Sequence, residues 1–98
     1  MKAVVITKHG GPDVLKVEER PEPTLSAGEI RVDVAAAGIN FADVMARLGL
    51  YPDAPKTPCV VGYEVAGTVS EVGAGVTGFA VGERILGATK FGGYASQV

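Results

Sequence analysis

The clearest hydrophobic pattern in the chain is an alternation of apolar and other residues between positions 30 and 36. The residues on the apolar side of this alternation are Ile30, Val32, Val34 and Ala36. A period of two is typical of a β-strand with one buried and one solvated face. Residues 2–7 are rich in β-branched side chains and residues 14–19 also alternate, so we expect two more strands joined by a turn at residues 9–13.

The period changes between residues 41 and 48, where the spacing of apolar residues predicts a short helix. We expect four of its side chains to face the core, namely Phe41, Val44, Met45 and Leu48. Asn40 stands before this helix as a favourable N-cap, and Asp43 occupies the third helical position, where a carboxylate complements the helix dipole. Gly49 fits the end of the helix.

Beyond the helix the chain returns to strand-like segments that are interrupted by glycine. Residues 60–72 form a strand region containing Gly62 and Gly67, and a glycine inside a strand often marks a bulge, a bend or a close backbone approach. Two more strands are expected near residues 82–86 and 92–98. About six short strands and one short helix, without strand–helix alternation, predict a mainly β domain and exclude a doubly wound parallel sheet.

The amino-acid composition and the distribution of charge exclude some classes of function. The 98 residues are 47% hydrophobic and 20% charged with a net charge of -2, which describes one folded domain. The nine Lys and Arg are scattered, so no basic stripe is available for a nucleic-acid partner. No apolar run approaches the roughly 20 residues of a membrane span. Cys59 is the single cysteine, which we expect to be buried and inert in a cytoplasmic, reducing compartment.

One glycine-rich segment matches a motif that is known from dinucleotide-binding proteins. Residues 73–78 match G-x-G-x-x-G, a pattern that binds dinucleotides only between a strand and a helix that faces the pyrophosphate. The segment that follows is too short before Gly82 to form that helix. We therefore interpret residues 73–78 as a β-turn.

Side chains that can do chemistry in a cleft are concentrated between residues 38 and 67. They include the amide of Asn40, the carboxylates of Asp43 and Glu64, and the phenols of Tyr51 and Tyr63. Each also has a purely structural interpretation. Asn40 and Asp43 can serve only to cap the helix, Glu64 can be a buried group that holds the nearby bend, and Tyr63 can be a packing residue.

Several short motifs, taken in their order along the chain, resemble a known family. The motifs are Gly38-Ile39-Asn40-Phe41-Ala42-Asp43, Gly49-Leu50-Tyr51, Pro58 to Gly67, Val72-Gly73 with Gly75-Val76, Gly82-Glu83-Arg84-Ile85 and Gly92-Gly93-Tyr94-Ala95. This order resembles the N-terminal, GroES-like catalytic domain of the medium-chain dehydrogenase/reductase superfamily. Within it, the zinc-free quinone oxidoreductase branch and its vesicle-amine-transport-like proteins are the most similar. The resemblance covers essentially the whole chain and implies a GroES-like, partly open barrel.

The resemblance also implies that no metal is bound. The zinc branch of the superfamily carries Cys where this chain has Asn40 and His where it has Tyr63, and an amide and a phenol are poor zinc ligands. Glu64 remains from the zinc-type Gly-His-Glu pattern, but a carboxylate alone will not hold zinc. The four-cysteine loop of a structural zinc site is absent.

In the zinc-free branch the resemblance implies NADPH-dependent reduction of quinones or activated enones. Residues matching Asn40, Asp43 and Tyr51 line the catalytic cleft of the family, so these three are the expected catalytic residues. Asn40 would also contact the cofactor, donating to a substrate or nicotinamide carbonyl. Tyr51 and Tyr63 are expected to line the substrate pocket.

The family holds NADPH on a Rossmann domain, which would follow Val98. We therefore expect residues 1–98 to be the catalytic-domain part of a longer parent, to bind no cofactor alone and to be inactive alone. A barrel cut in this way exposes strand edges, so we expect self-association. The alternative is a free-standing small β-barrel that works as a binding or assembly module without catalysis.

Overall fold

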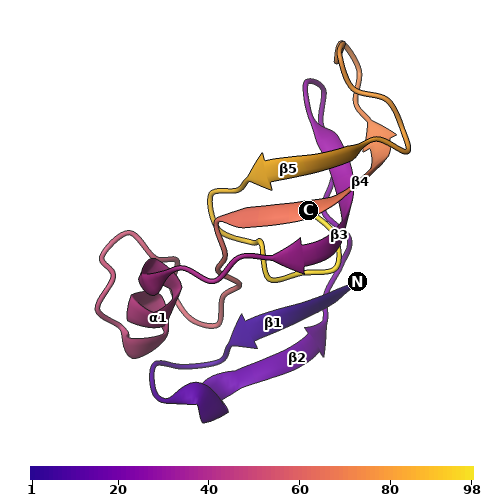
Figure 1. Cartoon of the computed structure of the whole chain (residues 1–98). Helices are drawn as coiled ribbons and strands as arrows, with labels where there is room; N and C mark the ends of the chain where they lie inside the picture. The colour runs from indigo at the N-terminus through magenta and orange to yellow at the C-terminus, as the bar shows by residue number, and fades with distance from the viewer.

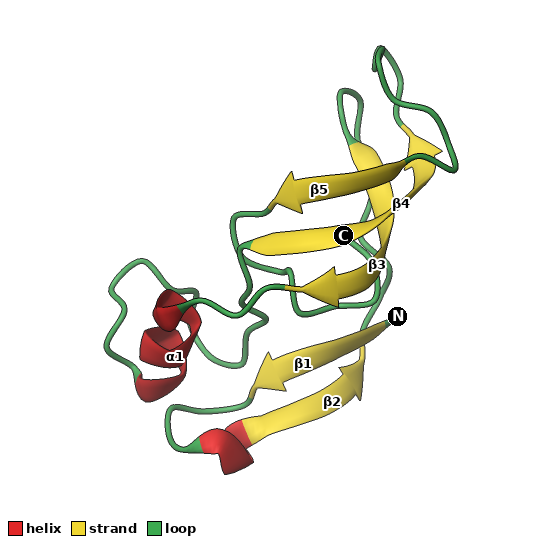
Figure 2. Cartoon of the chain, in the orientation of Figure 1, coloured by secondary structure: helices red, strands yellow, loops and turns green.

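Two antiparallel sheets make up most of the computed structural model, which describes residues 1–98 (Figure 1; Figure 2). The first sheet pairs β1 (Lys2–Ile6) with β2 (Leu15–Glu19), and the second has the order β3 (Ile30–Ala37), β4 (Glu64–Val72), β5 (Arg84–Ala88). The single α-helix, α1 (Phe41–Leu48), lies at one end of both sheets (Figure 1). The mainly β fold with one short helix confirms the prediction from the sequence.

The β1–β2 hairpin forms where the sequence predicts it. Ile6 stands opposite Leu15, and a short 3-10 helix, η1 (Pro12–Val14), makes the turn between the strands. Proline suits the start of this turn because its fixed φ matches a helical first position. Thr7 ties the turn down by donating its Oγ1 hydrogen to the Val14 carbonyl oxygen at 2.7 Å.

The C-terminal segment (residues 94–98) joins the two sheets. Its backbone accepts from Val4 on β1, where the N–H of Val4 lies 2.8 Å from the Tyr94 carbonyl oxygen. On the other side, the Val34 N–H on β3 donates to the Ser96 carbonyl oxygen at 2.9 Å. This segment therefore takes the place of the sixth strand that we expected, with isolated bridges rather than a full ladder. The outer edges of β2 and β5 have no neighbouring strand, as in a partly open barrel.

The strand region at residues 60–72 is only partly a strand. β4 starts at Glu64, because the residues before it pair elsewhere. Cys59 exchanges two backbone hydrogen bonds with Ile6 on β1, and the Gly62 carbonyl oxygen accepts from the Gly93 N–H at 3.2 Å. The prediction of a strand starting at residue 60 is thus wrong by a few residues, since this stretch crosses between the sheets.

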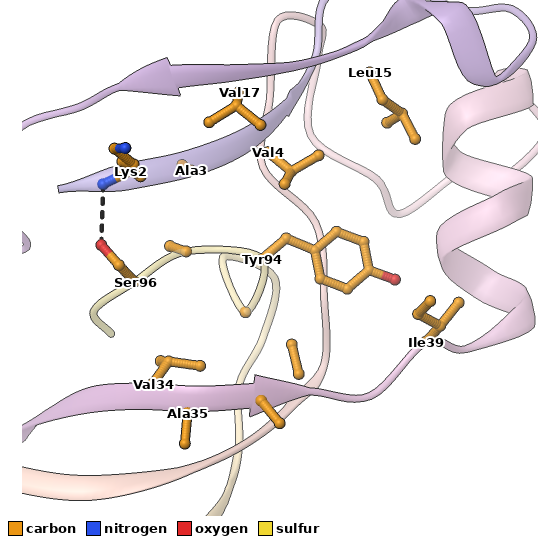
Figure 3. A pocket seen from close by; sticks show the side chains of 14 residues that line it. Lys2, Ala3, Val4, Leu15, Val17, Val34, Ala35, Ile39, Tyr94 and Ser96 are labelled. Atoms are coloured by element: carbon orange, nitrogen blue, oxygen red, sulfur yellow. Dashed lines mark hydrogen bonds between the residues drawn. The ribbon is translucent and has the colours of Figure 1, made fainter.

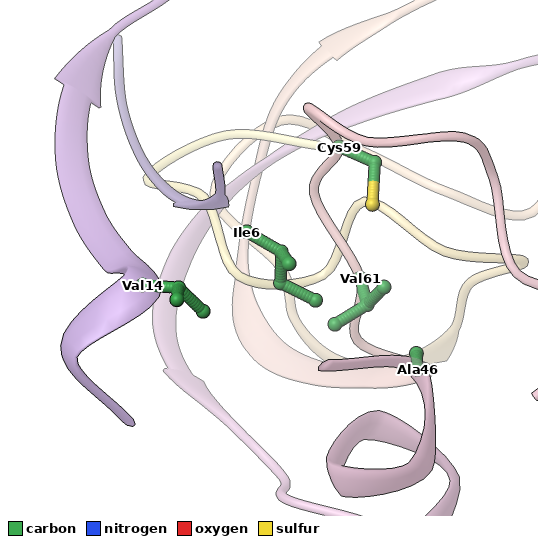
Figure 4. Packing of buried hydrophobic residues seen from close by; sticks show 5 residues of the cluster. All are labelled: Ile6, Val14, Ala46, Cys59 and Val61. Carbon is green, nitrogen blue, oxygen red and sulfur yellow. The ribbon is translucent and has the colours of Figure 1, made fainter. Parts of the chain in front are cut away.

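The largest buried cluster lies between the hairpin, α1 and the segment before β4 (Figure 4). Its members are Ile6, Val14, Ala46, Cys59 and Val61. Cys59 is only 8% exposed, which confirms its expected burial, and this burial raises the pKa of its thiol. A buried thiol with a raised pKa is a packing group and a weak nucleophile.

The face of α1 that meets the core differs from the expected one. Phe41 is 76% exposed and Leu48 is 43% exposed, so the prediction that these two side chains face the core is wrong. Asp43 and Ala46 are buried instead, one turn apart on the same side of the helix. A helix of only two turns touches the rest of the fold through one narrow row of side chains.

The α1 helix is too short to cross a membrane, and no other helix of the chain is long and apolar enough to do so.

Candidate functional site

The first turn of α1 fixes two of the residues that the sequence singled out. Asn40 is the N-cap, with extended backbone angles of φ -113° and ψ 156°, and it forms a capping box with Asp43. The backbone N–H of Asn40 donates to Asp43 Oδ2 at 3.0 Å. The helix ends at Gly49, whose φ of 78° is the left-handed conformation that glycine adopts at low cost. The predicted capping roles of Asn40, Asp43 and Gly49 are confirmed.

Two polar atoms in this capping box are buried without a hydrogen-bond partner. They are the amide nitrogen Nδ2 of Asn40 and the carboxylate oxygen Oδ1 of Asp43. Leaving a buried polar group unpaired costs about 1–3 kcal/mol, so nearly all such groups in folded proteins find a partner. Asn40 Nδ2 is therefore a free donor that a carbonyl group of a ligand could satisfy.

Tyr94 is a third member of this group, which the sequence did not identify. Its hydroxyl donates to Asp43 Oδ2 at 2.5 Å, across 51 positions of the chain. Its ring points from the C-terminal segment toward the start of α1 (Figure 3). Burial and, after it, the hydrogen bond to Asp43 raise the pKa of the Tyr94 phenol above its ordinary value, so it stays a proton donor.

Three aromatic rings form a second group beside the first. The Tyr63 ring lies 5.3 Å from the Phe91 ring and 6.4 Å from the Tyr51 ring, measured between centroids, and both pairs are tilted. The adjacent Tyr51 hydroxyl and, after it, burial raise the pKa of the Tyr63 phenol to about 12. Asp43 contributes to the same shift, which places its charge within reach of Tyr63.

A groove of about 610 Å³ lies next to Tyr63 and is lined by the end of β3, the start of β4 and the end of β5. Its walls are mostly apolar, and its polar lining comes from Tyr63 and Glu64. Glu64 is exposed, so the interpretation of it as a buried group holding the bend is wrong. Its side chain lies over Gly38, where any added Cβ would overlap the carboxylate.

The structure therefore brings the predicted site residues together in two pairs. Asn40 and Asp43 share the start of α1, and Tyr51 and Tyr63 share the aromatic group. Only Tyr63 of these four lines the groove itself. Phe91 and Tyr94 join the two groups from the C-terminal end of the chain. The Gly92-Gly93 pair between these two aromatic residues was the only sequence signal for them.

The glycine motif takes no part in this site, and no cluster of metal-binding side chains accompanies it. Residues 73–78 form turns with no helix after them, as the sequence predicted. No group of three or more His, Cys, Asp or Glu side chains comes together anywhere in the chain.

Comparison with known proteins identifies the family. The family model of the alcohol dehydrogenase GroES-like domain matches residues 26–97. The crystal structure of the human synaptic vesicle membrane protein VAT-1 homolog-like protein superposes with a TM-score of 0.96 at 36% identity, covering 100% of this chain and 32% of that one. The chain therefore belongs to the alcohol dehydrogenase GroES-like domain family, within the medium-chain dehydrogenase/reductase superfamily.

Quinone oxidoreductases are also among the similar proteins. The quinone oxidoreductase of Salmonella typhimurium is 46% identical over 90 residues, which are 91% of this chain and 27% of that protein. The Escherichia coli quinone oxidoreductase, solved in complex with NADPH, superposes with a TM-score of 0.91 at 39% identity, over 100% of this chain and 30% of that one. The chain thus spans between about a quarter and a third of the length of these relatives.

Proposed function

We propose that this chain is the substrate-side domain of a longer, NADPH-dependent reductase that acts on quinones or activated enones without a catalytic metal. The observation that carries the proposal is the buried, unpaired Nδ2 of Asn40 at the start of α1. An unpaired amide donor can bind a carbonyl oxygen more tightly as negative charge develops on it, which lowers the barrier of the reaction. The similarity to quinone oxidoreductases supports the same substrate class.

Asn40 has the central role in this proposal. Its Nδ2 would donate to the carbonyl oxygen of the substrate, or to the carboxamide oxygen of the nicotinamide ring. Its backbone N–H donates to Asp43 Oδ2 at 3.0 Å, which holds the backbone of Asn40 at the start of the helix. Asp43 acts on the reaction through Asn40, as the group that holds it.

Tyr51 and Tyr63 would form the aromatic wall against which a flat quinone ring packs. Their rings lie 6.4 Å apart, and Tyr63 opens into the groove of about 610 Å³. The Tyr63 pKa of about 12 keeps this phenol protonated at neutral pH, so it offers a hydrogen-bond donor and no base. The role of this wall is to orient the substrate and to exclude water.

NADPH, when bound, supplies the hydride. The residues at the start of α1 fit the nicotinamide end of such a cofactor, because Asn40 Nδ2 lacks an acceptor. The phosphate end finds no comparable partner in this chain, since the glycines at 75 and 78 lie in open turns that lead into no helix. We therefore propose that a second, dinucleotide-binding domain of the longer protein holds the phosphates.

We propose a metal-free mechanism because of the side chains at the two positions where the zinc branch carries metal ligands. The amide of Asn40 and the phenol of Tyr63, with its pKa raised to about 12, are both poor ligands for zinc. The carbonyl would instead be polarised by hydrogen bonds. Such a bond, made in a site sheltered from water, is worth about 2.7–4 kcal/mol of transition-state stabilisation.

The test is the steady-state kinetics of Asn40→Ala in the complete protein that carries this chain. We expect kcat for NADPH-dependent quinone reduction to fall by about 100-fold, because a donor aimed at developing charge is lost. Gln97→Ala is the matched control, since Gln97 is a half-buried amide in the C-terminal segment whose nitrogen donates to Asp33 Oδ1 at 3.3 Å, and whose oxygen is buried without a partner as Asn40 Nδ2 is. Unchanged kinetics in Asn40→Ala would overturn the role given to this residue.

A further inference from the structure

Tyr94 is connected to Asn40 through a single carboxylate oxygen. Oδ2 of Asp43 accepts the Tyr94 hydroxyl at 2.5 Å and the Asn40 backbone N–H at 3.0 Å. Asp43 is the buried charged side chain of the fold, with 4% of its surface exposed. Hydrogen bonds to a buried charge are about twice as strong as neutral ones, so this oxygen is a firm link between the two donors.

Tyr94 is held by two backbone hydrogen bonds and by one contact of its ring. Its backbone N–H donates to the Val61 carbonyl oxygen at 3.0 Å, and its carbonyl oxygen accepts from the Val4 N–H at 2.8 Å. Its ring lies against Gly62, where an added Cβ would come within 2.8 Å of the ring atom Cδ1. Gly62 also has a φ of 113°, a conformation that favours glycine. The ring therefore has a fixed position relative to both sheets.

We propose that Tyr94 is a positioning residue that fixes the backbone of Asn40 at the start of α1 by way of Asp43, and so sets the place from which the Asn40 side chain reaches the carbonyl. Neither the sequence motif nor any relative's name gives Tyr94 this role. The inference rests on the proposed function, because it is the Asn40 amide that meets the carbonyl. Tyr94 itself lines a separate, mostly apolar groove of about 480 Å³ between β1 and β3 (Figure 3), and in the proposed reaction it touches neither substrate nor cofactor.

The test compares four forms of the complete protein: wild type, Tyr94→Phe, Asn40→Ala and the double variant. Tyr94→Phe keeps the ring and removes only the hydroxyl. We expect it to lower kcat by roughly 10-fold with little change in KM, since it misdirects a transition-state donor and leaves the aromatic wall in place. In the Asn40→Ala background the same change should lower kcat no further, because Tyr94 acts through Asn40.

Thr7→Val is the matched control for general loss of stability. Thr7 also donates one short side-chain hydrogen bond, to the Val14 carbonyl oxygen at 2.7 Å, but it lies outside the site. We expect Thr7→Val to lower the denaturation midpoint and leave kcat unchanged. A fall in kcat equal to that of Tyr94→Phe would mean that loss of a buried hydrogen bond, wherever it lies, explains the effect, and would overturn the proposal.

The outcomes separate this inference from the function on which it rests. If Asn40→Ala lowers kcat and Tyr94→Phe does not, the proposed function stands and the positioning role fails. If Tyr94→Phe lowers kcat equally in both backgrounds, Tyr94 acts independently of Asn40 and the positioning role also fails. If Asn40→Ala itself leaves kcat unchanged, both proposals fall. An independent readout is the NMR signal of the Asn40 backbone N–H, which should shift in Tyr94→Phe and keep its position in Thr7→Val.

Discussion

At the scale of single residues, Asp43 is the side chain that connects the parts of the candidate site. It is buried, it forms the capping box with Asn40, it accepts the Tyr94 hydroxyl, and its charge reaches Tyr63. One of its carboxylate oxygens nevertheless lacks a partner. A buried charge that is only partly satisfied is costly in stability, and such sites are where function is usually found.

The Tyr94–Asp43 contact predicts a specific dependence of stability on pH. The pKa of the Tyr94 phenol is raised in the folded chain, so its contribution to stability is complete below the unfolded pKa of about 10 and is lost as the pH rises through the folded pKa. The pKa of the Tyr63 phenol is also raised, to about 12, so its contribution to stability is likewise lost as the pH rises. We expect the free energy of unfolding to fall above about pH 10.

Tyr94→Phe isolates the part of this effect that belongs to Tyr94. At about pH 9 the variant should be less stable than the wild type by about 1–3 kcal/mol, because a hydrogen bond to a buried charge is lost. At about pH 11 the difference should shrink, since the wild type has begun to lose the same contribution. Denaturant titrations at the two pH values measure this, and a difference that stays constant would contradict the assignment.

The sequence could predict the capping residues but not the contact with Tyr94. Asn40, Asp43 and Gly49 follow local rules of helix ends, which depend only on neighbouring positions. The hydrogen bond from Tyr94 joins residues 51 positions apart, and no local rule relates them. The same limit explains why Phe91 was not identified as a neighbour of Tyr63.

At the scale of elements, α1 shows how an amphipathic pattern can mislead in a short helix. Apolar residues at helical spacing predicted a core-facing row, yet Phe41 and Leu48 are exposed. The helix sits at the end of the sheets (Figure 1), and only Asp43 and Ala46 of its residues are buried. Position in the fold overrides the pattern when a helix has only two turns.

The close pairing of β3 with β4 requires a glycine at one position. Gly67 lies opposite Val34 beside a shift in register, and an added Cβ would overlap the backbone carbonyl oxygen of Asp33. A backbone atom cannot move aside as a flexible side chain can. Gly67→Ala should therefore destabilise the chain by about 1–3 kcal/mol in thermal or chemical denaturation.

Gly87→Ala is the matched control on the neighbouring strand. A Cβ at Gly87 would meet only the Ile85 and Val65 side chains, at 3.4 Å and 3.7 Å, which are ordinary contacts. We expect its effect on the free energy of unfolding to stay within about 0.5 kcal/mol. Equal effects of the two substitutions would mean that the close approach at Gly67 does not limit stability.

At the scale of the whole molecule, the alternating pattern was enough to predict a mainly β fold, and the family resemblance implied the partly open barrel. The sequence could not show how the sheets are joined. That depends on residues 94–98 bonding to β1 and β3 at once, over separations that exceed half the chain. We expected a strand near residues 92–98, but its sequence does not show that this segment bonds to β1 on one side and to β3 on the other.

The open barrel predicts self-association of the isolated chain. β5 has a free edge, and Leu86 on it is 87% exposed. Unpaired edges with exposed apolar side chains favour pairing between copies, and a charged side chain on the edge opposes it. We expect sedimentation velocity to show concentration-dependent oligomers for the wild type and fewer for Leu86→Lys. A clean monomer of the wild type at high concentration would contradict this prediction.

The most direct test of the account is the quinone-dependent oxidation of NADPH, followed for the complete protein and for the 98-residue chain side by side. We expect the complete protein to oxidise NADPH and the chain alone not to, because we propose that this chain supplies only the substrate side of the site and that another domain holds the phosphates. Oxidation by the chain alone would put the cofactor site within these residues. No oxidation by the complete protein, with quinones or enones, would contradict the proposed reaction itself.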